Sequence, residues 1–186
     1  MSSPPIAGYL KISLAIVALA LALIAASIIL DLGNRISYSV VTFNGTGDPG
    51  KSALVVYDGG LTGTGNRIAM ALEREFHDRG YRLKVASIGA PGIEGAAGFH
   101  VIFVISPTYP GGPSAPISRF LGNASFDPDA LVVTVAVSGL LGDNATPRMA
   151  DALEARGIAV AGQASLSPWD RDLDEHSYAI VYSLPL

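Results

Sequence analysis

Ala53-Leu-Val-Val-Tyr-Asp-Gly-Gly-Leu-Thr-Gly-Thr-Gly-Asn66 is the stretch that decides the fold of this chain. Its first five residues form a short continuous apolar run, which is typical of a strand buried on both faces of a sheet. A turn rich in glycine and threonine follows from Asp58 to Asn66. The residues from Arg67 to Arg79 then carry apolar side chains at helical spacing, and Gly80 ends the helix. This order predicts one strand–loop–helix unit of a parallel sheet.

The same order repeats toward the C-terminus. Further strands are predicted at 82–88, 99–105, 131–137 and 158–166, and further helices at 114–121 and 146–156. The helix at 146–156 has Thr146 as its predicted N-cap and Pro147 at its first position. Buried strands that alternate with helices predict an α/β fold, a doubly wound parallel sheet of about five strands.

Two parts of this pattern are irregular. Only a short segment rich in glycine and alanine joins the strands at 82–88 and 99–105, so the helix expected between them is nearly absent. No amphipathic helix is evident after the strand at 158–166. The residues from Tyr178 to Tyr182 instead read as a strand, which could pair with the extended patch from Tyr38 to Phe43.

The N-terminal part of the chain is much more apolar than the rest. Residues 12–30 carry no charge, and a helix of this length covers roughly the 30 Å hydrocarbon core of a bilayer. A secretory signal peptide has a shorter apolar run followed by a small-residue cleavage site, whereas Ala25 and Ala26 lie inside this run. We therefore predict an N-terminal tail at 1–11, a single transmembrane helix at 12–30, a linker at 31–52 and one domain at 53–186.

The sequence gives only weak signals for the side of the membrane on which the domain lies. Lys11 and the α-amine flank the apolar run on one side, and Asp31 and Arg35 flank it on the other. Asn44, Asn123 and Asn144 each begin an Asn-x-Ser/Thr triplet, which favours an extracytoplasmic domain. The balance leans slightly toward the extracytoplasmic side.

Composition excludes several classes of function. The chain has 12 basic and 16 acidic residues, a net charge of −4, and no run of lysine or arginine, so nucleic acid and anionic lipid are not its partners. The absence of cysteine excludes disulfides, thiolate metal sites, iron–sulfur clusters and cysteine nucleophiles. The three histidines are scattered along the chain, and their spacing predicts no metal site. No catalytic residue is predicted.

One motif matches a nucleotide-binding formula without its structural context. Gly45-Thr-Gly-Asp-Pro-Gly-Lys-Ser52 fits the P-loop pattern G-x-x-x-x-G-K-[ST]. A P-loop must follow a strand and begin a helix, so that backbone amides and the helix N-terminus bind the phosphates. Here the match runs directly into the predicted strand at Ala53. We interpret the match as a coincidence, and we do not expect a nucleotide triphosphatase.

Three loops are predicted to meet at the carboxyl edge of the sheet, where open α/β sheets bind their ligands. Thr62-Gly-Thr-Gly-Asn66 lies between a strand and a helix and provides amides and hydroxyls for a phosphate; Ile68 replaces the third glycine of a dinucleotide loop. Ser106-Pro-Thr-Tyr-Pro-Gly-Gly-Pro113 presents the ring of Tyr109 between prolines and glycines. Ser138-Gly-Leu-Leu-Gly-Asp143 follows the next strand and lacks the G-x-S-x-G pattern of a hydrolase. A simple capped helix and a rigid surface turn remain the plain alternatives for the first two loops.

Together these loops resemble flavodoxins over about residues 53–165, with the first two loops in the order and spacing of that family. The resemblance implies a flavodoxin-like fold and FMN bound without a covalent link, with the FMN phosphate on the first loop and the isoalloxazine ring between the second and third loops. The residues that the resemblance assigns to FMN are Thr62, Gly63, Thr64, Gly65, Asn66, Arg67, Pro107, Thr108, Tyr109, Gly111, Gly112, Ser138, Gly139, Leu140 and Asp143.

The chain also departs from the flavodoxin pattern. Arg67 stands where the family usually has another serine or threonine, and Gly59-Gly-Leu61 adds length before the phosphate loop. The first hypothesis is an electron-transfer flavoprotein held at the membrane near an unidentified redox partner. The alternatives are a flavin-dependent NAD(P)H or quinone reductase, for which no nicotinamide site is identified, and a flavodoxin fold that has lost flavin and serves as a binding or assembly domain.

Overall fold

The structure is a computed structural model that divides into two compact units, Met1–Ser37 and Tyr38–Leu186. The residues it describes are 15–19, 21–22, 40–43, 51–91, 93, 95–110, 112–139 and 142–186. In the first unit, residues 15–19 and 21–22 are helical, and the rest of the predicted transmembrane segment 12–30 and the tail 1–11 lie outside the described residues. Within the described part of the chain, we find no helix that has both the length and the apolar character needed to cross a bilayer.

The second unit is built on one seven-stranded sheet with the order β1-β3-β2-β4-β6-β7, to which β5 adds by pairing with β4. The strands are β1 (Val40–Phe43), β2 (Ser52–Tyr57), β3 (Arg82–Ser87), β4 (Val101–Tyr109), β5 (Gly112–Pro113), β6 (Leu131–Val137) and β7 (Val160–Leu166). The strands β3, β2, β4, β6 and β7 are mutually parallel, whereas β1 and β5 pair antiparallel with β3 and β4. The five predicted strands are confirmed, and two short strands extend the sheet.

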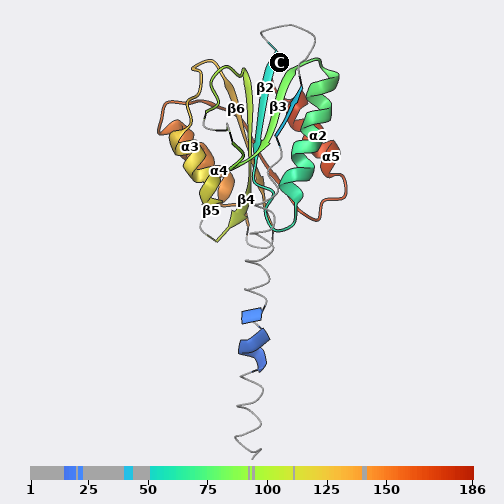
Figure 1. Ribbon diagram of the computed structural model, residues 1–186, viewed down its shortest axis with the longest axis vertical. Coiled ribbons are helices and arrows are strands. Elements are labelled where there is room, and N and C mark those ends of the chain that lie inside the picture. Colours follow the sequence, from blue (N-terminus) through green and yellow to red (C-terminus); the bar gives the residue numbers. More distant parts are fainter. Residues whose placement is uncertain are drawn as a thin grey trace, which may run out of the picture. The chain divides into compact units, whose positions relative to one another are not determined.

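Helices cover both faces of this sheet, as Figure 1 shows, so the predicted doubly wound architecture is confirmed. The helices are α2 (Thr64–Asp78), α3 (Ala115–Asn123), α4 (Ala145–Glu154) and α5 (Leu173–Tyr182). The helices α2 and α5 pack on one face, and α3 and α4 pack on the other. Alternate residues of each central strand therefore enter two separate cores, which is why these strands read as continuous apolar runs.

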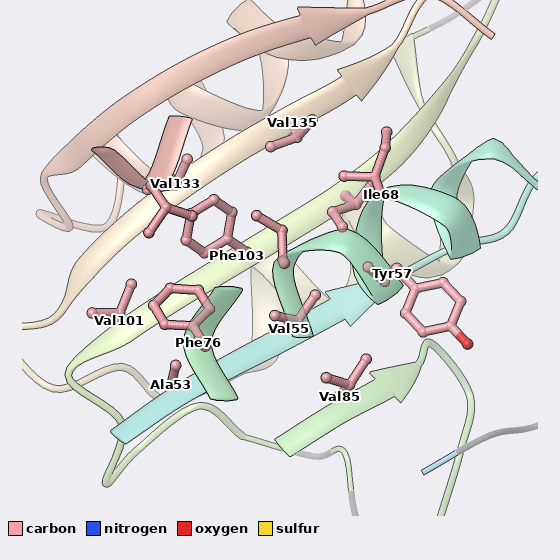
Figure 2. Packing of buried hydrophobic residues seen from close by; sticks show 14 of the residues in the cluster. Ala53, Val55, Tyr57, Ile68, Phe76, Val85, Val101, Phe103, Val133 and Val135 are labelled. Atoms are coloured by element: carbon pink, nitrogen blue, oxygen red, sulfur yellow. The ribbon is translucent and has the colours of Figure 1, made fainter. Parts of the chain in front are cut away.

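The face under α2 and α5 has an aromatic centre. The ring of Phe76 on α2 lies 5.6 Å from the ring of Phe103 on β4 and 5.0 Å from that of Tyr81, both in edge-to-face geometry. Figure 2 shows Phe76 beside Phe103 and Ala53, with Ile68 farther along the same buried face of α2. Phe76, Phe103 and Ile68 are fully buried. This packing fixes the direction of α2 on the sheet, and with it the place where the helix begins.

A helix is absent between β3 and β4 in the described residues, as predicted. The connecting segment covers the second face of the sheet with the buried side chains of Ala90, Ile93 and Ala96 instead. Backbone and side-chain hydrogen bonds hold the segment in place: the Ala96 amide donates to the Ser125 carbonyl at 2.8 Å, and the Gly98 amide donates to the Asp127 carboxylate at 2.7 Å.

The predictions for the C-terminus are wrong. The residues from Tyr178 to Tyr182 belong to helix α5, not to a strand, and β1 pairs with β3 instead. The buried residues of α5 are Leu173, Ser177 and Val181, a helical stripe with four-residue spacing. The stripe escaped detection because its middle member is a serine, whose hydroxyl donates to the Leu173 carbonyl at 2.7 Å and so needs no other partner.

The strand β1 shows where the chain enters the sheet. The interval 31–52, predicted as a linker with a possible short strand, contains β1, and Val40 pairs with Ala86 near the carboxyl end of β3. Because β1 runs antiparallel to β3, its first residue lies at the carboxyl edge of the parallel sheet and its last residue lies toward the opposite edge. The strand β1 thus begins at the carboxyl edge of the parallel sheet.

Candidate functional site

The loops that follow β2, β4 and β6 contact one another at the carboxyl edge of the sheet. The Asp58 amide donates to the Ile105 carbonyl at 3.0 Å, which ties the first loop to the end of β4. A side chain on Gly60 would come within 3.0 Å of Pro107, so the first and second loops are packed together. The Thr108 and Ser138 hydroxyls are 3.2 Å apart and join the second loop to the third. The structure thus brings the three predicted loops to one place.

The first loop leads into helix α2 with no side-chain cap. The N-cap residue Gly63 has a left-handed conformation, φ 68°, and the first turn contains no acidic residue. The first amide with a partner one turn back is that of Arg67, which donates to the Gly63 carbonyl at 3.2 Å. The helices α3 and α4 differ, because the Ser114 hydroxyl and the Asp143 carboxylate accept from their first turns. The positive end of the α2 dipole is therefore left for an anion from outside the chain.

Hydroxyl groups stand beside this helix end. The Thr62 and Thr64 hydroxyls are 2.8 Å apart; Thr64 is buried, whereas Thr62 is exposed. Asn66 and Arg67, in the first turn of α2, are also exposed. The loop therefore offers backbone amides, two hydroxyls, an amide side chain and a guanidinium, a donor set suited to a phosphate.

Glycines let the first loop bring α2 close to β2, and they leave space beside the loop backbone. A side chain on Gly65 would lie 2.1 Å from the Asp58 carbonyl oxygen, so only glycine allows α2 to begin so close to β2. A side chain on Gly59 or Gly63 would meet no atom within 4 Å. The backbone at these two positions is therefore open to an approaching group.

The second loop is held by a buried serine. The Ser106 hydroxyl accepts from the Ser114 amide at 2.9 Å and donates to the Pro107 carbonyl at 3.0 Å. Thr108 and Tyr109 follow with half-buried side chains, and Tyr109 pairs with Gly112 in the short β4–β5 hairpin. Gly112 has a φ of 121°, and a side chain there would come within 2.7 Å of the Arg148 side chain. Gly111, also predicted as a site residue, lies outside the described residues.

The third loop is fixed by Ser138 and Asp143. The Ser138 hydroxyl accepts from the Ser165 hydroxyl at 2.8 Å, which links this loop to the end of β7. Burial alone raises the pKa of the Asp143 carboxyl, but hydrogen bonds from Thr146, Ser165 and the Ala145 amide outweigh it and hold the pKa below its ordinary value. Gly139 is exposed, and Leu140 lies outside the described residues.

The cap predicted for α4 is corrected by this geometry. Thr146, predicted as the N-cap, is inside the helix, and its amide and that of Ala145 donate to the Asp143 carboxylate at 3.0 and 3.2 Å. The capping carboxylate is thus supplied one residue before the N-cap position. Asp143, predicted as a cofactor ligand, serves here to begin a helix.

A fourth loop at this edge was missed by the sequence analysis. Residues 167–172 follow β7 and carry Trp169, which is 65% exposed. The Asp170 carboxylate accepts from the His176 ring at 2.6 Å, and this hydrogen bond, aided by the charges of His176 and Arg67, lowers the pKa of Asp170 below its ordinary value. The tryptophan that follows the last predicted strand is the sequence signal that could have identified this loop.

The other candidate motifs have structural roles or none. Ser52, the last residue of the P-loop match, is buried at the start of β2, where its hydroxyl lies 2.8 Å from the His100 ring and donates to the Gly98 carbonyl at 3.2 Å. The match runs into a strand, as the sequence indicated, and residues 44–50 lie outside the described residues. Among the residues that the structure describes, no group of histidines and carboxylates can hold a metal ion.

Comparison with solved structures identifies the architecture. The chain is similar to a flavodoxin of Streptococcus pneumoniae, with a TM-score of 0.58 and 15% identity over 72% of this chain and 96% of that one. A flavodoxin from the Archaea matches with a TM-score of 0.54 and 16% identity over 71% and 95% of the two chains. The fold is flavodoxin-like.

Larger flavodoxin-like proteins are also similar to this chain. The rubredoxin oxygen:oxidoreductase of Desulfovibrio gigas matches with a TM-score of 0.57 and 14% identity over 72% of this chain, which spans only 35% of that protein. No protein-family model and no curated protein sequence matches the chain. The order of the five parallel strands, β3-β2-β4-β6-β7 with β4 at the centre, agrees with the fold that the loops predicted.

The Gly65 contact generates the first prediction. Gly65→Ala places a methyl group against the Asp58 carbonyl and should lower the free energy of unfolding by about 1–3 kcal/mol or more. Gly59→Ala is the matched control, because open space surrounds that position, and its effect should stay within about 0.5 kcal/mol. Chemical denaturation of both variants tests this. Equal stabilities would contradict the close approach of α2 to β2.

The pair of Asp170 and His176 generates the second prediction. The hydrogen bond and charge of Asp170 raise the pKa of His176 above its ordinary value of 6.5. A raised pKa in the folded state means that the pair stabilises the fold fully below pH 6.5 and loses this effect as the pH rises through the raised value. An NMR titration of His176 should show the raised pKa, and Asp170→Asn should lower it toward the ordinary value, while the charges of Asp172 and Glu175 still act on the ring. His77→Gln is the control and should leave the titration of His176 unchanged.

Proposed function

We propose that this chain binds FMN without a covalent link and transfers electrons to or from a redox partner at a membrane. The observation that carries the proposal is the uncapped N-terminus of α2. It lies beside the hydrogen-bonded hydroxyls of Thr62 and Thr64, at the carboxyl edge of a flavodoxin-like sheet. Anions bind readily where backbone amides and the helix dipole face a ligand edge.

The residues divide into two groups in this proposal. The phosphate group is held by the loop from Thr62 to Asn66, with the exposed guanidinium of Arg67 available for a further charge-assisted hydrogen bond. The ring system is held between the loop of Thr108 and Tyr109 and the loop that begins at Ser138. The hydrogen bond between Thr108 and Ser138 keeps these two loops at a set separation.

Flavin supplies one- and two-electron chemistry when it is bound, and the protein positions the ring and tunes its electronics. The acidic balance of the chain acts on that tuning, since a net negative field disfavours added negative charge on the ring and lowers its reduction potential. Asp58 adds to this field at the loop itself, where its carboxylate accepts from the Gly60 amide at 3.0 Å.

The comparisons share one part with this chain. The two flavodoxins are covered almost end to end, 95% and 96%, whereas the chain spans about a third of the rubredoxin oxygen:oxidoreductase. The similar part in each case is the flavodoxin-like domain, and for that domain we propose the electron transfer that a bound flavin supports.

We also propose that residues 12–30 anchor the protein as a single-pass membrane protein, with the flavin domain on the extracytoplasmic side. The support is the uncharged run of 19 residues and the three Asn-x-Ser/Thr triplets. Only nine residues, 31–39, separate this run from Val40, and nine extended residues reach about 30 Å. An anchor raises the effective concentration of the domain for partners in the same membrane.

The third prediction tests flavin binding on the full-length protein, purified in detergent with and without added FMN. Visible flavin bands should stay with the protein through gel filtration. Thr62→Ala should weaken FMN binding by about tenfold, because a hydrogen bond to a charged group is lost, and should leave riboflavin binding unchanged. Thr42→Ala, an exposed threonine on β1, is the control. A folded, colourless protein that does not bind added FMN would contradict the proposal and favour the hypothesis of a flavin-free binding domain.

The fourth prediction tests the anchor. The full-length protein should stay in the membrane fraction after alkaline carbonate extraction, and a variant that lacks residues 1–37 should be released into the supernatant. Leu21→Arg should reduce membrane retention, because Leu21 is the central residue of the run 12–30 and a charge at the centre of an apolar span costs about 2.5–3.5 kcal/mol on insertion scales. Release of the unaltered protein by carbonate would contradict the proposal.

A further inference from the structure

Trp169 is the only tryptophan of the chain, and 65% of its surface is exposed. It lies three residues beyond Leu166, the end of β7, and so at the same carboxyl edge as the three loops of the proposed flavin site. The loop that carries it is held by short-range bonds: the Trp169 amide donates to the Ser167 hydroxyl at 3.3 Å, and the Asp170 amide donates to the Ser167 carbonyl at 3.1 Å. The ring is thus presented by an ordered turn.

The indole lies beside Gly139. The outer atoms of the ring lie 3.6 and 3.8 Å from where a side chain on Gly139 would begin, so the ring is next to the third loop. Ser138, the preceding residue, donates its amide to the Leu166 carbonyl at 2.9 Å, which joins the ends of β6 and β7. The indole therefore stands at the rim of the loop that the proposed function assigns to the flavin ring.

The next residue links the same turn to the phosphate loop. Asp170 is bonded to His176 at 2.6 Å, and the charge of Arg67, in the first turn of α2, acts on its carboxylate. The turn 167–172 therefore lies beside Gly139, and the charge of Arg67 at the start of α2 acts on its Asp170.

We propose that Trp169 forms a wall of the ligand site and stacks on the planar ring system of the ligand. This inference rests on the proposed function, since it names a contact within that site. An indole offers a large aromatic face with only two side-chain torsions to order, so a planar heterocycle gains contact at low entropic cost. Tyr109 supplies an aromatic ring from the second loop, and Trp169 adds one from the fourth.

The assignment has a consequence for ligand choice. Contacts to the ring system are shared by FMN and riboflavin, whereas the first loop contacts only the phosphate. Removing the indole should weaken the binding of both ligands by one common factor. Stacking of a planar base on an aromatic side chain is worth about 1–3 kcal/mol by alanine substitution, which corresponds to a factor of roughly 5–150 in affinity.

The first test uses Trp169 as its own probe. Titration of the full-length protein with FMN should quench nearly all tryptophan fluorescence, because a stacked flavin quenches at contact. The matched control moves the only tryptophan: Trp169→Phe combined with Tyr182→Trp places the indole at the far end of α5, beside Arg79 and the C-terminus of α2. Tyr182 is 69% exposed, so the two sites are alike in exposure. Quenching in the control should be much weaker and its fluorescence lifetime much less shortened.

The second test compares affinities in Trp169→Ala, Trp169→Phe and Thr62→Ala, with FMN and riboflavin as the two ligands. We expect Trp169→Ala to weaken the binding of FMN and of riboflavin by about the same factor. The variant Trp169→Phe should keep most of the affinity for both ligands, and Thr62→Ala should weaken the binding of FMN alone. Because the indole is largely exposed, its truncation should leave the far-UV spectrum and the melting temperature unchanged.

Two negative results can be told apart. If the unaltered protein binds neither flavin, the proposed function is wrong, and so is the assignment of Trp169 to the ligand site. If the protein binds FMN while Trp169→Ala keeps the unaltered affinity and the indole is quenched no more than the control at position 182, only the role of Trp169 is overturned.

Discussion

The rest of the structure depends on the parallel ladder of β3, β2, β4, β6 and β7, whose central strands β2, β4 and β6 are buried on both faces. Residues Ala53 to Val56 and Ile102 to Ile105 are wholly inaccessible, so a polar side chain placed there without a partner would destabilise the fold. Parallel strands need crossover connections, and these connections bring every loop that follows a strand to a single edge. The ladder thus explains why loops far apart in sequence meet at the candidate site.

The site adds a second constraint, the close approach of α2 to β2. The contact between Gly65 and the Asp58 carbonyl leaves no room for a side chain, and the aromatic packing of Phe76 and Phe103 holds the other end of the helix. A helix fixed at both ends presents its first-turn amides in a set direction. The helix α2 has no side-chain cap, whereas α3 and α4 are capped, and this helix end is the anion position of the proposed function.

The loops at this edge are rigid in part because they share hydrogen bonds. Ser138 bonds both Thr108 and Ser165, and Asp143 begins α4 while it is also held by Ser165. The turn after β7 joins this network through the Leu166 carbonyl and carries Trp169 over Gly139. A ligand that binds here meets preorganised walls, which lowers the entropic cost of binding.

The sequence by itself determined the alternation of buried strands and helices, the three loops at the carboxyl edge and the missing β3–β4 helix, because continuous apolar runs and glycine-rich turns are local signals. Only the tertiary structure decided the rest. Helix α5 is held by packing on α2 through a stripe that includes Ser177, and the cap of α4 comes from Asp143, which the pattern at Thr146 concealed. Trp169 reached the site through the pairing of β6 with β7, a contact between residues distant in sequence that no local pattern encodes.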